Sequence, residues 1–239
     1  MILIGTAGWS IPRASASHFA PEGTHLQRYA RLLDCAEINS SFYRPHSART
    51  YAKWADLTPA SFRLSVKVPR VITHDRKFRR ARDPLEAFLA QTRGLGRKRG
   101  PLLVQLPPSF AFEPRAASGF FTLLRSLHRG PVVFEPRHAT WFSEKANALL
   151  VRHRIARVGA HPAVVPGAEL PGGWPGILYY RLHGAPRKYW SSYEPGEIAA
   201  IADALRAVPV RTDAWCIFDN TASGAALANA LELLAKLKG

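Results

Sequence analysis

Residues 131–141 read PVVFEPRHATW, and this stretch contains the pattern that decides the fold. Residues 132–134 form an apolar run that is too short for a helix, which favours a buried strand. The run ends in Glu135, Arg137 and His138, so the strand would carry polar side chains at its end. The same pattern, an apolar strand that ends in polar groups, recurs at Glu37, Lys67, Gln105, His183 and Asp219. This recurrence indicates several parallel strands whose polar groups lie at one end of a sheet.

The predicted strands occur throughout the chain and alternate with helical patterns. The expected strands are residues 2–7, 35–39, 62–68, 101–106, 132–134, 155–158, 177–182 and 214–218. The expected helices are residues 26–33, 47–57, a helix from Asp83 to the turn at 94–100, and residues 116–127, 144–152, 197–207 and 224–236. One strand and one helix repeat about every 30 residues, which predicts an α/β fold with a parallel sheet closed as a TIM-like (β/α)8 barrel. An open doubly wound sheet is the alternative.

One connection is expected to differ from the others. Residues 161–176 are rich in Pro and Gly and show no helical period. The crossover between the sixth and seventh strands is therefore predicted to lack a regular helix. Since no linker interrupts the repeat, we expect a single barrel domain over residues 1–239.

Alternate residues of a strand face opposite sides of the sheet, and this alternation favours the closed barrel. In the second strand Ala36 and Ile38 share one face, and Glu37 and Asn39 share the other. The later strands repeat the arrangement, with one apolar face for the helices and one face that turns polar toward the carboxyl end. This arrangement fits a closed barrel, in which the outer face of each strand packs on helices and polar residues of the inner face cover the interior at the carboxyl end.

The composition restricts the class of protein. The chain has 239 residues, 47% of them hydrophobic, and a formal net charge of +16, which favours anionic small molecules or nucleic acid as partners. An Arg-rich proteome is the alternative explanation. The two Cys lie in apolar runs and favour buried thiols in a reducing compartment. We find no signal-peptide pattern and no apolar run of about 18 residues, so a cytoplasmic protein without membrane contact is expected. The oligomeric state is left open.

In a barrel the polar strand ends converge on one mouth, and this defines the candidate site. Glu37 or Glu135 is the candidate general base, and His74 or His183 is the candidate general acid. Lys67, Arg137 and Arg181 are the candidate charge stabilisers. The full set of predicted substrate-binding residues is Trp9, Asn39, Tyr43, Lys67, Gln105, Arg137, Trp141, Arg181, Asp219 and Asn220.

Two structural explanations compete with this site. Carboxylates and cations nearly balance, so the strand ends could form an ion-pair network that covers the core. The aromatic residues of the loops could simply fill the top of the barrel. A metal site is conceivable because the ligand types are suitable, but they show no local spacing motif, so no metal ligands are assigned and the cofactor is left open. Its ligands would come from Glu37, His74, Glu135, His183 and Asp219.

Residues 70–82 carry six cations against one acid. Such a run could follow a phosphate backbone, and its contacts would weaken steeply with salt. A solvated surface is the alternative.

Seven short motifs, in the same order along the chain, resemble those of the YecE-like family, also called domain of unknown function 72. They are residues 5–9, 37–43, 66–69 with 72–74, 105–108, 135–138 with Trp141, 181–184, and 218–220 with 224–225. The resemblance covers essentially the whole chain and implies a TIM-like barrel, but it implies no activity. The chain departs from the family at residues 159–161, where Gly-Ala-His stands in place of a frequent acidic residue.

The leading hypothesis is a barrel enzyme, a hydrolase or another phosphoester-acting enzyme, that acts on a phosphate-bearing ligand such as a nucleotide or nucleic acid. The alternative is a noncatalytic nucleic-acid-binding protein that uses its basic surface.

Overall fold

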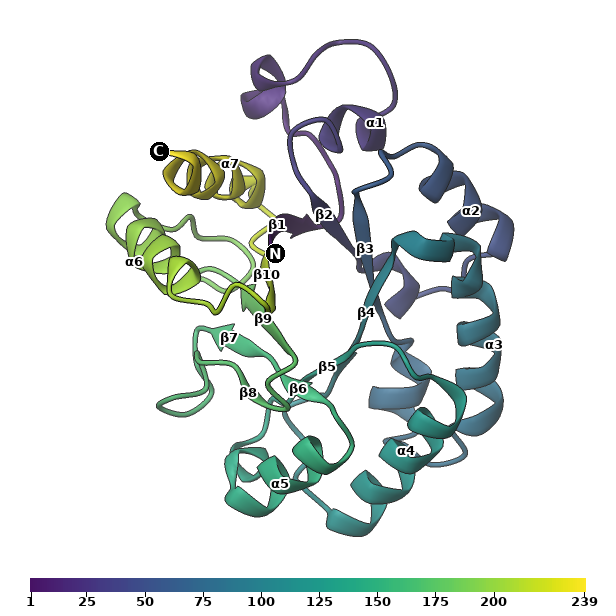
Figure 1. Cartoon of the computed structure of the whole chain (residues 1–239). Coiled ribbons are helices and arrows are strands. Elements are labelled where there is room, and N and C mark those ends of the chain that lie inside the picture. The colour runs from purple at the N-terminus through teal and green to yellow at the C-terminus, as the bar shows by residue number, and fades with distance from the viewer.

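The computed structural model describes the whole chain, residues 1–239, and its strands form one sheet that curves into a barrel (Figure 1). The central strands pair in parallel. The strands are β1 (Ile2–Ala7), β2 (Cys35–Ile38), β3 (Arg63–Lys67), β4 (Arg99–Gln105), β5 (Val132–Glu135), β6 (Ala156–Arg157), β7 (Gly159–His161), β8 (Gly172–Gly173), β9 (Ile177–Leu182) and β10 (Asp213–Phe218).

The helices surround the sheet on its outside (Figure 1). They are α1 (His25–Tyr29), α2 (Ala48–Asp56), α3 (Arg82–Thr92), α4 (Pro114–Leu127), α5 (Glu144–Arg152), α6 (Pro195–Arg206) and α7 (Ala225–Lys238). The predicted α/β barrel is confirmed. No helix combines the length and the hydropathy that a membrane crossing requires.

The two ends of the sheet meet at the position of the sixth strand, where the barrel is nearly closed. β6 pairs with β5, and β7, which begins two residues after β6 ends, pairs with β9 on the other side of the barrel. The predicted strand at residues 155–158 therefore corresponds to β6 alone, and β7 follows it as a second short strand that completes the barrel. The crossover that follows contains β8, which pairs antiparallel with β6, and no helix, as the Pro- and Gly-rich composition predicts.

The strand alternation has the expected outcome. Ala36 and Ile38 face outward into the large core of 48 buried residues between sheet and helices. Cys35, on the face that Glu37 shares, belongs to a separate cluster of 11 buried residues inside the barrel. The interior is thus apolar below and polar at the carboxyl ends of the strands.

Several helix boundaries differ from the prediction by a few residues, and two of them involve the capping of the first turn. α1 ends at Tyr29, earlier than expected. Thr24 precedes it as the N-cap, and the side chains of Thr24 and Gln27 form a capping box around the first turn. α3 begins at Arg82, so Asp83 lies in the first turn rather than at the N-cap. There its carboxylate interacts favourably with the helix dipole.

Candidate functional site at the barrel mouth

Arg181, from β9, lies at the centre of the polar layer and is fully buried. Its guanidinium donates to both carboxylate oxygens of Glu37, at 2.7 and 3.0 Å. It also donates to Glu135 Oε2 at 2.6 Å and to Asp219 Oδ2 at 2.8 Å. Three carboxylates from β2, β5 and the end of β10 therefore share one buried cation. These ion pairs are the reason that charges can be buried here.

His183 joins two of these carboxylates above Arg181. Its Nδ1 lies 3.0 Å from Asp219 Oδ2, and its Nε2 lies 3.0 Å from Glu135 Oε1. Arg137 Nη2 makes an ion pair with Glu135 Oε1 at 2.6 Å and lies 3.1 Å from His183 Nε2. Arg137 and Arg181 hold the pKa of Glu135 well below its usual range, against the effect of burial. Glu135 is therefore an anion at neutral pH.

Two further side chains position the carboxylates. Tyr179, buried on β9, donates to Glu37 Oε2 at 2.9 Å and lies 2.8 Å from the hydroxyl of Ser65. Gln105 donates to Glu135 Oε2 at 3.1 Å. Tyr179 was not among the predicted site residues, although the alternation along β9 puts it on the same face as Arg181.

Lys67, at the end of β3, differs from the other charged groups because it has no partner. Its residue is 5% exposed, and its Nζ makes no ion pair or hydrogen bond; it lies 4.2 Å from the ring centroid of Phe42. Burial, helped by the charge of Arg181, lowers the pKa of Lys67 to about 8. An ammonium group without a carboxylate partner is thus held at the mouth.

Other cations surround the same opening. Burial and the nearby Arg137 lower the pKa of Lys188 to about 8. Burial and the charge of Lys67 lower the pKa of His74 to about 4, so this imidazole is neutral at pH 7. Its Nδ1 lies 2.9 Å from Thr73 Oγ1, and its ring packs edge-on against Phe42. Burial is the main cause of these pKa shifts, and the neighbouring positive charges add to it.

Some polar atoms here also lack a partner. Arg137 Nε and Asn39 Oδ1 are buried and make no hydrogen bond. Arg137 Nη2 additionally donates to the hydroxyl of Tyr189 at 3.3 Å. Since unpaired buried groups are costly, the mouth favours a ligand that would satisfy them.

The residues of the predicted metal alternative do not form a metal site. No group of three or more His, Cys, Asp or Glu side chains is arranged to hold an ion. The carboxylates of Glu37, Glu135 and Asp219 instead converge on the Arg181 guanidinium, which occupies the position that a cation would take.

Most of the predicted site residues meet as expected, but four do not. Trp141 is 1% exposed and packs in the outer core, where its Nε1 donates to the carbonyl of Phe110. Asn220 faces away from Asp219 and binds the Ser191 carbonyl and Asn229, so it supports a loop. Because Trp141 and Asn220 are buried away from the mouth, the structure does not place them where they could bind a substrate, contrary to the prediction.

The other two residues lie at the periphery. Trp9 packs edge-on against Trp54 of α2, with ring centroids 5.1 Å apart. Tyr43 is 73% exposed and contacts Phe42. The interior of the mouth is therefore formed by charged groups rather than by the predicted aromatic residues Trp9, Tyr43 and Trp141.

Comparison with known proteins places the fold in a wider group. Residues 3–239 match a family model described as "Protein of unknown function DUF72". The UPF0759 protein YecE of Escherichia coli O157:H7 is 30% identical over 169 residues, which cover 69% of this chain and 59% of that protein. The alignment thus spans less than two thirds of the relative's length.

Solved structures of low sequence identity share the fold. A DUF72 family protein of Enterococcus faecalis, EF0366, superposes with a TM-score of 0.83 at 20% identity over 100% of this chain and 96% of that chain. A DUF72 family protein of Thermotoga maritima, TM1631, gives a TM-score of 0.82 at 23% identity over 100% of both chains. At these identities the similarity concerns the fold alone.

Proposed function

The chain belongs to the family described as protein of unknown function DUF72, and we propose that its barrel mouth binds a phosphate-bearing ligand, a nucleotide or a segment of nucleic acid. The family membership confirms the resemblance inferred from the seven motifs. The proposal for the ligand is supported by the site itself.

The observation that carries the proposal is the unpaired ammonium of Lys67. Every carboxylate nearby, Glu37, Glu135 and Asp219, is already bound to a guanidinium, and none makes a direct ion pair with Lys67, although their charges attract it. A charge in a partly desolvated position gains most from an anion that reaches it. Lys188 and Arg137 would add further donors to the same anion, which favours a ligand with more than one negative charge.

The contacts also indicate how the predicted catalytic residues act. Glu37, Glu135 and His183 are fully buried. The carboxylate and imidazole atoms of these side chains are engaged within the network, which favours a role in positioning Arg137 and Arg181 over direct proton transfer. His74 keeps Nε2 free of any protein partner, and it is the candidate for a proton transfer in hydrolysis.

Titration calorimetry with ATP at pH 7 tests the proposal. Lys67→Met is expected to weaken binding by about 10-fold or more, because a charge-assisted contact is lost. Lys145→Met, which removes an exposed lysine of α5, is the matched control and should bind as the unaltered chain does. Equal affinity in the two variants would contradict the proposal.

Turnover of a phosphodiester separates the enzyme from the binder. We expect bis(4-nitrophenyl) phosphate to be hydrolysed, and His74→Gln to abolish turnover with ATP affinity retained. If the unaltered chain shows no turnover while binding still depends on Lys67, the noncatalytic alternative is favoured.

The basic segment of residues 70–82 supports nucleic acid as the second candidate ligand. It starts three residues after Lys67, and Arg76, Lys77, Arg79 and Arg80 in it are exposed. These cations would extend the positive charge of the mouth along a polymer. Competition between ATP and a single-stranded oligonucleotide would show whether both use the mouth.

A further inference from the structure

We infer that a cavity at the amino-terminal end of the barrel is a second anion-binding site, suited to a small molecule that combines a planar ring with phosphate groups. This cavity is lined by residues at the starts of the strands, including Leu3, Arg63, Ile177 and Asp213. It therefore lies at the end of the barrel opposite to Lys67. Its volume is about 550 Å³, which is in the range of small-molecule sites.

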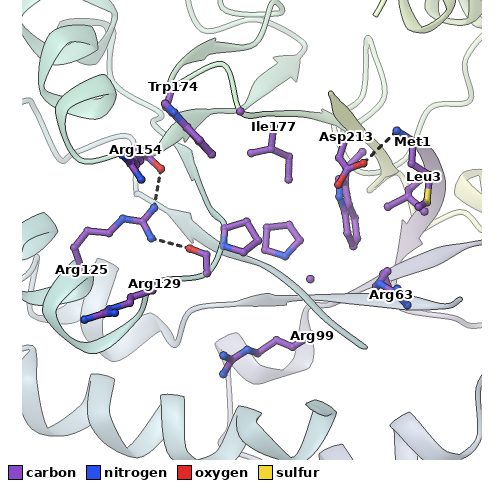
Figure 2. A pocket seen from close by; sticks show the side chains of 16 residues that line it. Met1, Leu3, Arg63, Arg99, Arg125, Arg129, Arg154, Trp174, Ile177 and Asp213 are labelled. Atoms are coloured by element: carbon purple, nitrogen blue, oxygen red, sulfur yellow. Dashed lines mark hydrogen bonds and ion pairs between the residues drawn. The ribbon is translucent and has the colours of Figure 1, made fainter. Parts of the chain in front are cut away.

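Five arginines line the cavity, and they lack acidic partners. They are Arg63, Arg99, Arg125, Arg129 and Arg154. None of them makes an ion pair with a carboxylate. The lining contains a single acid, Asp213, and Figure 2 shows it on the side away from Arg125, Arg129 and Arg154. The positive charge of the cavity is thus uncompensated.

Arg125 gives this arrangement a fixed geometry. Its guanidinium donates to four backbone carbonyls, those of His128, Gly130, His153 and Arg154, and two of these bonds are visible in Figure 2. The loops that carry Arg129 and Arg154 are therefore tied to one side chain. Burial lowers the pKa of Arg125, and the charge of Arg154 adds to the effect. The cluster is held together by backbone contacts, despite repulsion between its charges.

Arg129 and Arg154 provide the donors that a ligand needs. Both are exposed, and neither guanidinium makes a hydrogen bond within the protein. Arg154 also has a φ of 52°, in the left-handed region that side chains rarely adopt. Its carbonyl is the one that Arg125 Nη2 binds, which stabilises this conformation. The conformation ends α5, because the Arg154 N–H donates to the Val151 carbonyl and the Ile155 N–H to the Leu150 carbonyl.

Two tryptophans supply apolar walls for a ring. Trp215 is 3% exposed, stacks on Tyr179 with an interplanar angle of 16°, and contributes to the cavity lining. Gly100 allows this, because a Cβ there would lie 2.5 Å from the Trp215 ring. Trp174 is half-buried and lies at the cavity edge in Figure 2. Rings and free guanidinium groups in one cavity match the two parts of a nucleotide.

Titration calorimetry in the Lys67→Met background, where the mouth binds ATP more weakly, tests this site. We expect ATP to bind, tripolyphosphate to bind more weakly, and adenosine not to bind. The double variant Arg129→Gln/Arg154→Gln should weaken ATP binding by about 10-fold or more, and Trp174→Ala should weaken ATP binding but not tripolyphosphate binding.

The control removes two charges elsewhere. Arg115→Gln/Lys145→Gln changes exposed cations on α4 and α5 and should leave ATP affinity unaltered. A thermal melt verifies that each variant folds. The inference is overturned if ATP does not bind in the Lys67→Met background, or if the Arg129/Arg154 variant binds ATP as the control does. Because the mouth is the same in the Arg129/Arg154 variant and in its control, a difference in ATP affinity between the two belongs to this cavity.

Discussion

Arg181 is a fully buried charge that can be removed without a large loss of stability only if its carboxylate partners are removed as well. Its guanidinium contacts Glu37, Glu135 and Asp219, all of them buried. Buried ion pairs add little net stability compared with apolar packing, but a carboxylate left without its partner is costly. The cluster therefore fixes the positions of the strand ends in relation to one another.

Arg181→Met should lower the free energy of unfolding by about 3–5 kcal/mol, because three carboxylates lose their common cation. The loss should decrease as pH falls, since protonation neutralises the carboxylates. Urea denaturation at pH 7 and pH 5 measures both effects, with Arg115→Met on α4 as a control for a lost exposed cation. A loss of less than 1 kcal/mol at pH 7 would show that the network does not support the fold as described.

Lys67 should have the opposite effect on stability. Its pKa is lowered from 10.5 to about 8 by burial and Arg181, against the attraction of Glu37, Asp219 and Glu135. The unfolded chain thus binds more protons than the folded chain between pH 8 and 10.5, and the contribution of Lys67 to stability rises with pH across this window. Below pH 8 the charged lysine is a cost to folding.

Lys67→Met should therefore raise the free energy of unfolding at pH 7 by about 1–3 kcal/mol while weakening ATP binding. The difference between the variant and the unaltered chain should decrease toward pH 10. Urea denaturation at pH 7, 8.5 and 10 tests this, and taking the difference removes the contribution of Lys188. A destabilised variant at pH 7 would mean that Lys67 has a stabilising partner in solution.

The site was predictable from the sequence to the extent that strand alternation determines it. Glu37, Glu135, Arg181 and His183 lie on inward faces at strand ends, so their convergence follows from closure of the barrel. The alternation does not show which side chains contact each other. The ion pairs of Arg181 with all three carboxylates were therefore not predictable. Trp141 was misplaced because burial in the outer core depends on the path of its loop.

At the scale of elements, the basic segment of residues 70–82 has an unusual backbone. Lys77, Phe78 and Arg80 have positive φ values, of 44°, 71° and 47°. Phe78 anchors the segment by stacking on Phe120, with ring centroids 4.0 Å apart. The composition predicts the charge of this segment, but the strain has no sequence signal, because none of these residues is Gly or Asn.

Arg80→Gly and Arg79→Gly form a matched pair that tests the strain. Both remove one exposed arginine, but only Arg80 occupies the left-handed region. Glycine adopts this region without penalty, so Arg80→Gly should be neutral or stabilise the fold by up to about 1 kcal/mol. Arg79→Gly should destabilise it by about 0.5–1 kcal/mol through backbone entropy. Equal effects in urea denaturation would contradict the described conformation.

The sixth strand illustrates where element prediction is weakest. The sequence predicted one strand at residues 155–158, and the structure divides the pairing between β6 and β7. Each piece has three residues or fewer, and the Gly159 backbone passes so close to Pro171 and Glu169 that a Cβ would not fit. The pairing of strands as short as β6 and β7 depends on tertiary packing, which cannot be read from the local sequence pattern.

The whole molecule carries a formal net charge of +16, and the structure shows two places where cations that make no ion pair gather. One is the mouth with the adjoining segment 70–82, and the other is the amino-terminal cavity. The barrel itself was predictable, because the strand and helix repeat and the two strand faces are properties of the entire chain. The cavity was not, since its arginines come from the starts of strands, from α4 and from loops, and they share no local sequence pattern.

The distribution of charge predicts how nucleic-acid binding responds to salt. If a single strand follows the exposed cations beside the mouth, Lys77→Gln/Arg79→Gln/Arg80→Gln should reduce the slope of log K against log salt by about 2, at about 0.7 per lost phosphate contact. Arg129→Gln/Arg154→Gln removes charge at the opposite end and should leave the slope unchanged. Fluorescence anisotropy with a labelled oligothymidylate between 50 and 300 mM NaCl measures both. Similar reductions in the two variants would mean that the polymer binds by net charge alone rather than along the mouth.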